Sequence, residues 1–187
     1  MPKEFSKIDL EEIAAKNLKD GKPILVTPEI RQTVQSHIDA FMTELDAGYR
    51  QLAAVAAIED GRRTFANTAE VFDDFYNRME EAVNWPGFYA YVHPDPFVRA
   101  VGEEIDKFSS KFFVEVGSSK VLYESLKAFA STSPKLSAEE KYLLSENLMD
   151  FEDGGVGLEE KKREQFKALS KQLAELAIDF SSNVRDY

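Results

Sequence analysis

Apolar residues recur along this chain at steps of three and four positions, the spacing of one face of an α-helix. The pattern is clearest after Thr27-Pro28, where a capping side chain precedes the proline favoured at the first helical position. From there a single apolar stripe predicts a long helix over about 28–59. The stripe consists of Ile30, Val34, Ile38, Phe41, Leu45, Leu52, Val55 and Ile58.

A second long amphipathic pattern closes the sequence and predicts a helix over about 158–185. Its apolar positions are Leu158, Phe166, Leu169, Leu173, Leu176, Phe180 and Val184. No glycine or proline marks a stop before Tyr187. The last four apolar positions would be unusual on the surface of a complete monomer, so we expect the bundle or further sequence to cover them.

Capping boxes divide the remaining sequence into shorter helices. Asp9 with Glu12 predicts one helix start, and Ser137 with Glu140 predicts another. No segment shows the strict alternation typical of a strand, so we predict an all-α bundle of six or seven helices, two of them long. The 187 residues suit one helical domain over 1–187.

The middle of the chain contains a helix whose ends are marked by polar residues and proline. Asn67 or Thr68 is expected to cap it, and Trp85-Pro86-Gly87 is expected to stop it. The aromatic stretch 88–96 would then be an ordered connector or the start of a bent helix. Its rings and Trp85 follow no single stripe, which leaves bundle packing or a peptide-holding surface open, with packing favoured.

Charge and composition exclude several classes of function. There are 23 Lys and Arg against 34 Asp and Glu, a net charge of −11, which argues against nucleic-acid and anionic-membrane partners. The chain has no cysteine, so disulfides and thiolate metal sites are excluded. No signal-like segment or membrane-spanning run occurs, and we expect a cytoplasmic protein.

Candidate chemistry is sparse. Zinc hydrolysis needs two histidines one helical turn apart, whereas His37 and His93 are separated by 56 positions. We interpret His37 as a partly buried or surface side chain and His93 as a capping or turn-stabilising one. Gly154-Gly155-Val156-Gly157 lacks the Lys and Ser/Thr of a phosphate-binding loop. We therefore assign no catalytic, cofactor-binding or metal residue in this chain.

Three segments carry a resemblance to a known family. They are Thr64-Phe65-Ala66-Asn67-Thr68, the stretch Asp150 to Leu158, and the pair Leu169-Ser170-Lys171-Gln172-Leu173 with Phe180-Ser181-Ser182-Asn183-Val184. In order and spacing they resemble the amino-terminal helical region of the thimet-oligopeptidase (saccharolysin, oligopeptidase A) zinc metallopeptidases. One departure is that the family commonly has a basic residue near Asp153.

The resemblance implies a helical region that forms part of the wall of a channel admitting short peptides. The family's zinc ligands come from a His-Glu-x-x-His helix and a later Glu, which nothing here matches, so zinc is expected only in a full-length protein. The partners implied are the catalytic domain of the same chain and short peptides. Two alternatives remain: a stand-alone helical peptide- or protein-binding module derived from the family, and, more weakly, a self-sufficient enzyme with an unrecognised site.

Overall fold

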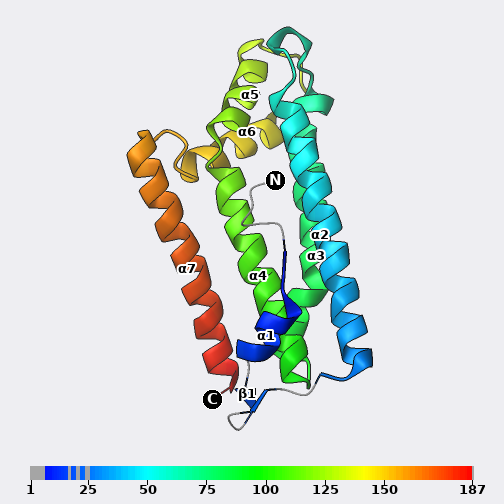
Figure 1. Ribbon diagram of the computed structural model, residues 1–187. Coiled ribbons are helices and arrows are strands. Elements are labelled where there is room, and N and C mark those ends of the chain that lie inside the picture. Colours follow the sequence, from blue (N-terminus) through cyan, green and yellow to red (C-terminus); the bar gives the residue numbers. More distant parts are fainter. Residues whose placement is uncertain (1–6, 17, 20–21, 24–25, 187) are drawn as a thin grey trace. The chain divides into compact units, whose positions relative to one another are not determined.

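The computed structural model describes residues 7–16, 18–19, 22–23 and 26–186, and these residues are mainly helical (Figure 1). Within them are seven α-helices: α1 (Leu10–Lys16), α2 (Pro28–Ala56), α3 (Glu70–Val92), α4 (Pro96–Gly117), α5 (Lys120–Ser131), α6 (Ala138–Asp153) and α7 (Glu160–Asp186). A 3₁₀ turn, η2 (Asp60–Arg62), and a π-helical turn, η3 (Phe65–Ala69), precede α3. The all-α prediction is confirmed. Both long helices occur where expected, although α2 ends three residues early.

The described residues contain one short antiparallel strand pairing. Strand β1 (Leu18–Lys19) pairs with β2 (Lys22–Pro23). The register places Leu18 opposite Pro23 and Lys19 opposite Lys22. So short a pairing does not alter the fold class.

The predicted capping signals start three of the helices. Thr27 Oγ1 accepts a hydrogen bond from the N–H of Ile30 at 3.3 Å in the first turn of α2. Ser137 and Glu140 form the full capping box of α6, each side chain accepting the other's backbone N–H. Asp9 Oδ1 accepts from two backbone N–H groups in the first turn of α1. These bonds pair N–H groups that the first helical turn leaves without partners.

The predicted ends of the α3 region were wrong at both sides. The cap is Thr64, whose Oγ1 accepts from the N–H of Asn67 at 3.2 Å. Asn67 Oδ1 in turn accepts from the N–H of Thr64 at 2.7 Å, so Asn67 is the third residue of a capping box. The helix then continues through Trp85-Pro86-Gly87 to Val92, and only residues 93–95 separate it from α4.

Close packing of α3 on α4 accompanies the proline inside α3. A proline costs a helix interior about 3 kcal/mol because it removes one backbone bond and crowds the preceding turn. Here Gly102 of α4 lies directly against the backbone around Pro86 and Ala90: a Cβ on Gly102 would lie 2.3 Å from the Pro86 carbonyl oxygen. The absence of a side chain at Gly102 allows this approach, and the contacts it permits help to offset the cost of Pro86.

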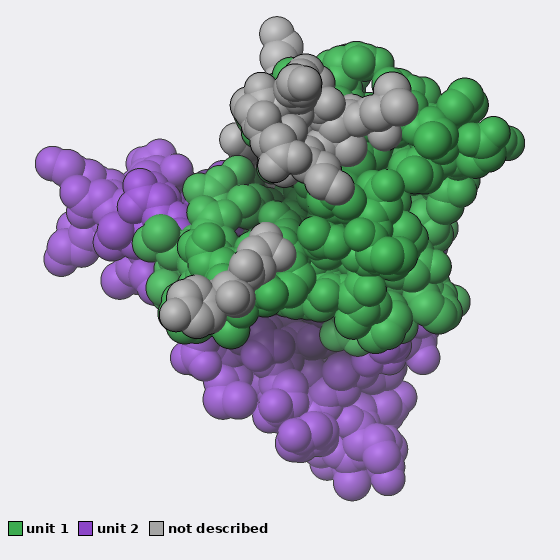
Figure 2. Space-filling model, turned by 90° about the horizontal axis from the view of Figure 1, so that it is seen from below, with its two compact units in different colours: residues 1–46, 79–111, 173–187 green, residues 47–78, 112–172 purple. Residues whose placement is uncertain are grey.

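The chain divides into two compact units (Figure 2). Unit 1 comprises residues 1–46, 79–111 and 173–187. Its core includes Phe41, whose ring meets Phe108 edge-on at 5.8 Å. Other fully buried side chains of unit 1 are Val34, Leu45, Met79, Phe97 and Ile105. Phe41, Val34 and Leu45 belong to the apolar stripe that predicted the helix over about 28–59.

Unit 2 comprises residues 47–78 and 112–172. Phe75 is completely buried, and its ring contacts those of Tyr76, Phe112 and Phe113. Other buried side chains of its core include Val55, Phe72, Leu126, Phe129 and Phe151. The prediction of a single domain over 1–187 stays a prediction. Within the ranges described above, no helix is both long and apolar enough to cross a membrane.

Candidate functional site

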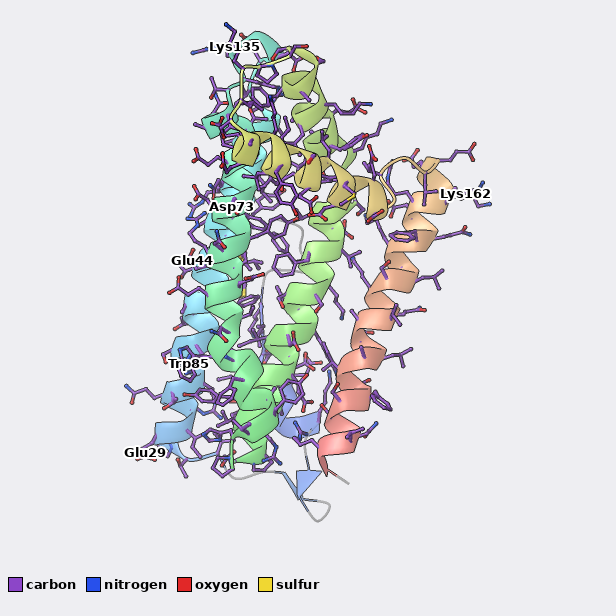
Figure 3. All side chains as sticks on the ribbon, turned by 180° about the vertical axis from the view of Figure 1, so that it is seen from behind. Glu29, Glu44, Asp73, Trp85, Lys135 and Lys162 are labelled. Carbon is purple, nitrogen blue, oxygen red and sulfur yellow. The ribbon has the colours of Figure 1, made fainter. Side chains whose placement is uncertain are left out.

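The end of α7 presents an apolar surface instead of burying it. Leu173, Leu176, Phe180 and Val184, all in unit 1, are 69%, 64%, 69% and 62% exposed. We call these four residues the α7 stripe. In Figure 3, many side chains of α7 project into open space on its side away from α4. The periodicity of the sequence predicts this stripe, and we expected the bundle or further sequence to cover it. Within the described residues the four side chains are exposed.

Ion pairs occupy the opposite face of this part of α7. Lys107 Nζ of α4 lies 2.5 Å from Asp179 Oδ1, and Lys111 pairs with Glu175. Burial disfavours the charged form of Lys107, but the hydrogen bond and charge of Asp179 outweigh it and raise the pKa of the lysine. Helices usually turn an apolar face inward, whereas in these turns the α7 stripe faces outward and the inner face combines the ion pairs with the buried Ile178.

A further ion pair holds the last turn of α7. Arg185 Nη1 lies 2.7 Å from Glu103 Oε1 and also donates to the backbone carbonyl oxygen of Ala90. The Arg185 and Glu103 side chains are 18% and 20% exposed. Partial burial makes such a charge-assisted contact stronger than a surface pair. Together with the two lysine pairs, it fixes the rotation of the helix and keeps the α7 stripe outward.

In unit 2 the first half of α7 is held by one carboxylate. Glu115 of α4 accepts from Lys167 through Oε2 and from Lys171 through Oε1, both at 2.7 Å. Burial of Glu115 favours the neutral acid, but the hydrogen bonds and charges of the two lysines outweigh it and lower the pKa of the carboxyl. Glu115 thus links α4 to α7 through two ion pairs.

We expect acid to weaken the ion pairs between Glu115 and the two lysines. Because the folded-state pKa of Glu115 lies below its ordinary value of 4.5, the stabilisation is present above that value and is lost as the pH falls through the lowered one. The loss should be up to about 1 kcal/mol for a partly exposed network. Urea unfolding at pH 6 and pH 3 measures it. The free energy of unfolding should depend less on pH in Glu115→Gln than in Glu159→Gln, a control variant at an exposed position. An equal change in the free energy of unfolding between pH 6 and pH 3 in both variants would contradict this role of Glu115.

A second exposed apolar surface lies at the end of α3. Trp85, which Figure 3 labels, is 58% exposed. Phe88 is 53% exposed, and the centroids of the two rings lie 6.1 Å apart. Because α3 continues past Pro86, it places three apolar side chains on one helix face. They are Trp85, Phe88 three positions later and Val92 seven positions later. Sequence reasoning placed these rings on no single stripe because it ended the helix too early. A peptide-holding role for them stays a prediction.

The two histidines lie on one aromatic ring. His37 meets Tyr89 at 5.6 Å between ring centroids, and His93 meets it at 5.4 Å. His93 Nδ1 accepts from the N–H of Asp95 at 3.1 Å, which confirms its predicted turn-stabilising role. Residues 7–16, 18–19, 22–23 and 26–186 contain no group of three His, Cys, Asp or Glu side chains that could hold a metal ion, so their donors do not fit a zinc site.

Unit 2 contains an open pocket of about 680 Å³ that sequence reasoning did not predict. Its lining comes from the end of α2, from η2 and the residue that follows it, and from α5, segments far apart in sequence, so no local motif could indicate it. Arg63 on its wall bonds Asp60 and the carbonyl oxygen of Val55, both at 3.0 Å. Lys120, Glu124 and Lys127 also line it. The mixed charges form no nucleophile–base pair.

Comparison with known proteins gives one consistent group of relatives. No family profile matches the chain. It is 26% identical over 164 residues to a thimet-like oligopeptidase of Dictyostelium discoideum, covering 85% of this chain and 24% of that protein. It is 27% identical over 155 residues to a probable cytosolic oligopeptidase A of Arabidopsis thaliana, covering 82% and 21%. A mitochondrial intermediate peptidase of Schizosaccharomyces pombe is 28% identical over 156 residues, covering 76% and 20%.

The matches extend over most of this chain but only a fifth to a quarter of each of these relatives. Their names agree with the resemblance carried by the segments at 64–68, 150–158 and 169–184. The chain is therefore related, over most of its length, to a segment of the thimet-type oligopeptidases.

Proposed function

We propose that this chain is the amino-terminal helical part of a zinc metallo-oligopeptidase and forms part of the wall of its substrate channel. The observation that carries the proposal is the coverage: relatives named as oligopeptidases match most of this chain within about a quarter of their own length or less. The motif at Thr64–Thr68 supports it, since its capping box starts the helical region that the family resemblance implies.

In the proposed enzyme, this chain forms part of the channel wall and contributes no catalytic side chain. Zinc peptidases need closely spaced ligands and a carboxylate base, and the two histidines here contact one tyrosine instead. Zinc, when bound in the longer protein, would activate water for attack on the peptide bond. The helices of this segment would limit which substrates reach that centre. We also propose a cytoplasmic location, which the name of the Arabidopsis oligopeptidase A supports.

A peptidase assay tests whether peptide hydrolysis requires the rest of the longer protein. We expect the purified 187-residue chain to leave a quenched fluorogenic nonapeptide intact, with or without added zinc. The native full-length protein should cleave the same peptide and lose its activity with a chelator. Cleavage by the 187-residue chain at a rate comparable to that of the full-length protein would overturn the proposal.

A stand-alone peptide-binding module is the second candidate, and the exposed aromatic face at the end of α3 favours it. Trp85 is the single tryptophan of the sequence and lies on that face, so its fluorescence reports directly on occupancy. Saturable change in Trp85 emission on adding 8- to 15-residue peptides would support this function, and Phe88→Ala should weaken the response. An unchanged spectrum up to millimolar peptide would exclude this surface.

A further inference from the structure

We propose that the open pocket of unit 2 binds a short peptide as a zwitterion: Arg63 and Lys120 bind the peptide's terminal carboxylate, and Glu124 binds its terminal ammonium group. The pocket has a volume of about 680 Å³, within the roughly 300–1,000 Å³ of typical small-molecule sites. Its walls come from the segment around η2 and from α5, which contact each other. The inference concerns this pocket alone and does not rest on the proposed channel-wall role.

Arg63 is a rigidly held donor on the pocket wall. Its side chain is only 4% exposed, its Nε donates to Asp60 Oδ1 and its Nη1 donates to the carbonyl oxygen of Val55, both at 3.0 Å. The same planar group carries further N–H donors, and the part of the chain that the structure describes provides no acceptor for them. Because the guanidinium is already fixed, it loses little side-chain entropy when it binds a carboxylate.

The α5 wall adds charges of both signs. Lys120, Glu124 and Lys127 line the pocket from successive turns of this helix. The Lys127 Nζ lies 5.1 Å from the centroid of the Tyr123 ring. Among the described residues, neither Lys120 nor Glu124 forms an ion pair. A carboxylate can therefore bind Lys120, and an ammonium group can bind Glu124, without first breaking a pair within the protein.

The balance of these charges favours a zwitterion over a simple ion. Asp60 is already paired with Arg63, which leaves Lys120 and Lys127 against Glu124. A simple anion in the pocket would be repelled by Glu124, and a simple cation would be repelled by the two lysines. A peptide with both ends free places a charge of the right sign beside each of these groups.

The rest of the lining indicates that the pocket recognises the ends of a peptide and not its side chains. The uncharged lining residues are small or apolar, and no aromatic ring is among them: Ala56, Val121, Ser125, Ala128 and Ser131. They offer room for a peptide backbone and no charged or aromatic contact for a particular side chain. Trialanine is therefore a suitable probe.

Binding should be weak because the pocket is open to solvent. Ion pairs exposed to water contribute little each, so we expect a dissociation constant on the order of 1 mM. Blocking either end of the peptide removes one charged contact and should weaken binding by about threefold or more. Salt should also weaken binding, because it screens both contacts.

Titration of the ¹⁵N-labelled 187-residue chain, followed by amide chemical shifts, tests the proposal. Trialanine should shift amides of η2 and α5 saturably, and N-acetyl-trialanine and trialanine amide should each bind more weakly. Equal affinity for the free and blocked peptides, or no shift in η2 and α5 up to tens of millimolar, would overturn the proposal. Equal affinity for free alanine would identify amino acids as the ligands and overturn the assignment to peptides.

Two variants at exposed positions test which residue binds which end. Glu124→Gln should remove the preference for a free amino end and keep the preference for a free carboxylate. Lys120→Gln should reduce the preference for the carboxylate and keep that for the amino end. The matched controls Glu159→Gln and Lys135→Gln change exposed residues of unit 2 outside the pocket and should bind like the unmodified chain. Unchanged end preferences in both pocket variants would contradict the assignment.

The same titration separates this pocket from the aromatic face at the end of α3. Trp85 belongs to unit 1 and does not line the pocket. Shifts confined to residues around Trp85 would place the peptide on that face and overturn the proposal. The proposed function would be unaffected, since it stands on cleavage by the longer protein and on the relatives.

Discussion

Replacing Gly102 by alanine is expected to destabilise unit 1 by roughly 1–3 kcal/mol, the usual range for overpacking a core. Alanine normally improves a helix by about 1 kcal/mol over glycine, so the expected sign is the reverse of the helix preference. The reason is contact with main chain: the new Cβ would lie 2.3 Å from the Pro86 oxygen and 2.9 Å from the Ala90 nitrogen. Neither atom can rotate away as a flexible side chain could.

Gly87→Ala is the matched control for this prediction. Gly87 lies in the same unit, inside α3, and a Cβ there meets nothing within 4 Å. It should stabilise the protein by up to about 1 kcal/mol. Urea unfolding followed by circular dichroism gives both values, and Trp85 emission reports on the neighbouring turn. Stabilisation by both alanines would show that α3 and α4 do not approach as closely as described.

Truncating Phe75 to alanine should destabilise unit 2 by about 3–5 kcal/mol, the range for removing a fully buried phenylalanine. Phe75 has no exposed surface, and its ring lies 5.1 Å from Tyr76, 6.1 Å from Phe112 and 6.3 Å from Phe113 between centroids. Its removal loses the transfer energy of the ring and leaves a cavity that these three neighbours only partly fill.

Leu173→Ala provides the contrast in the same experiment. Leu173 is 69% exposed on the α7 stripe, so at micromolar concentration its truncation should change the free energy of unfolding by less than about 0.5 kcal/mol. A large loss of unfolding free energy for Leu173→Ala, with a small loss for Phe75→Ala, would contradict the burial of Phe75 and the exposure of Leu173. The measurement is again urea unfolding by circular dichroism.

Local signals predicted most of the fold. Thr27-Pro28 and the Ser137–Glu140 box located helix starts because a cap depends on residues within one turn. The extension of α3 past Pro86 was not predictable in that way. It coincides with Gly102, sixteen positions later, whose missing side chain lets α4 lie against the proline turn. Interactions between distant segments of this kind carry no signal in a local pattern.

The same distinction applies to the candidate surfaces. Periodicity identified Leu173, Leu176, Phe180 and Val184 as one stripe, but it could not tell which side of α7 faces α4. That orientation depends on Glu103, Lys107 and Lys111, charged residues of α4 whose partners lie on α7. The family relation was predictable because it rests on short motifs in a fixed order, and the relatives confirm it.

The intact mass and the sequence of the native polypeptide show whether this chain is one segment of a longer peptidase. We expect a native protein several times larger than 21.2 kDa, with a His-Glu-x-x-His segment beyond Tyr187. A native polypeptide that begins at Met1, ends at Tyr187 and hydrolyses peptides without any other chain would contradict it.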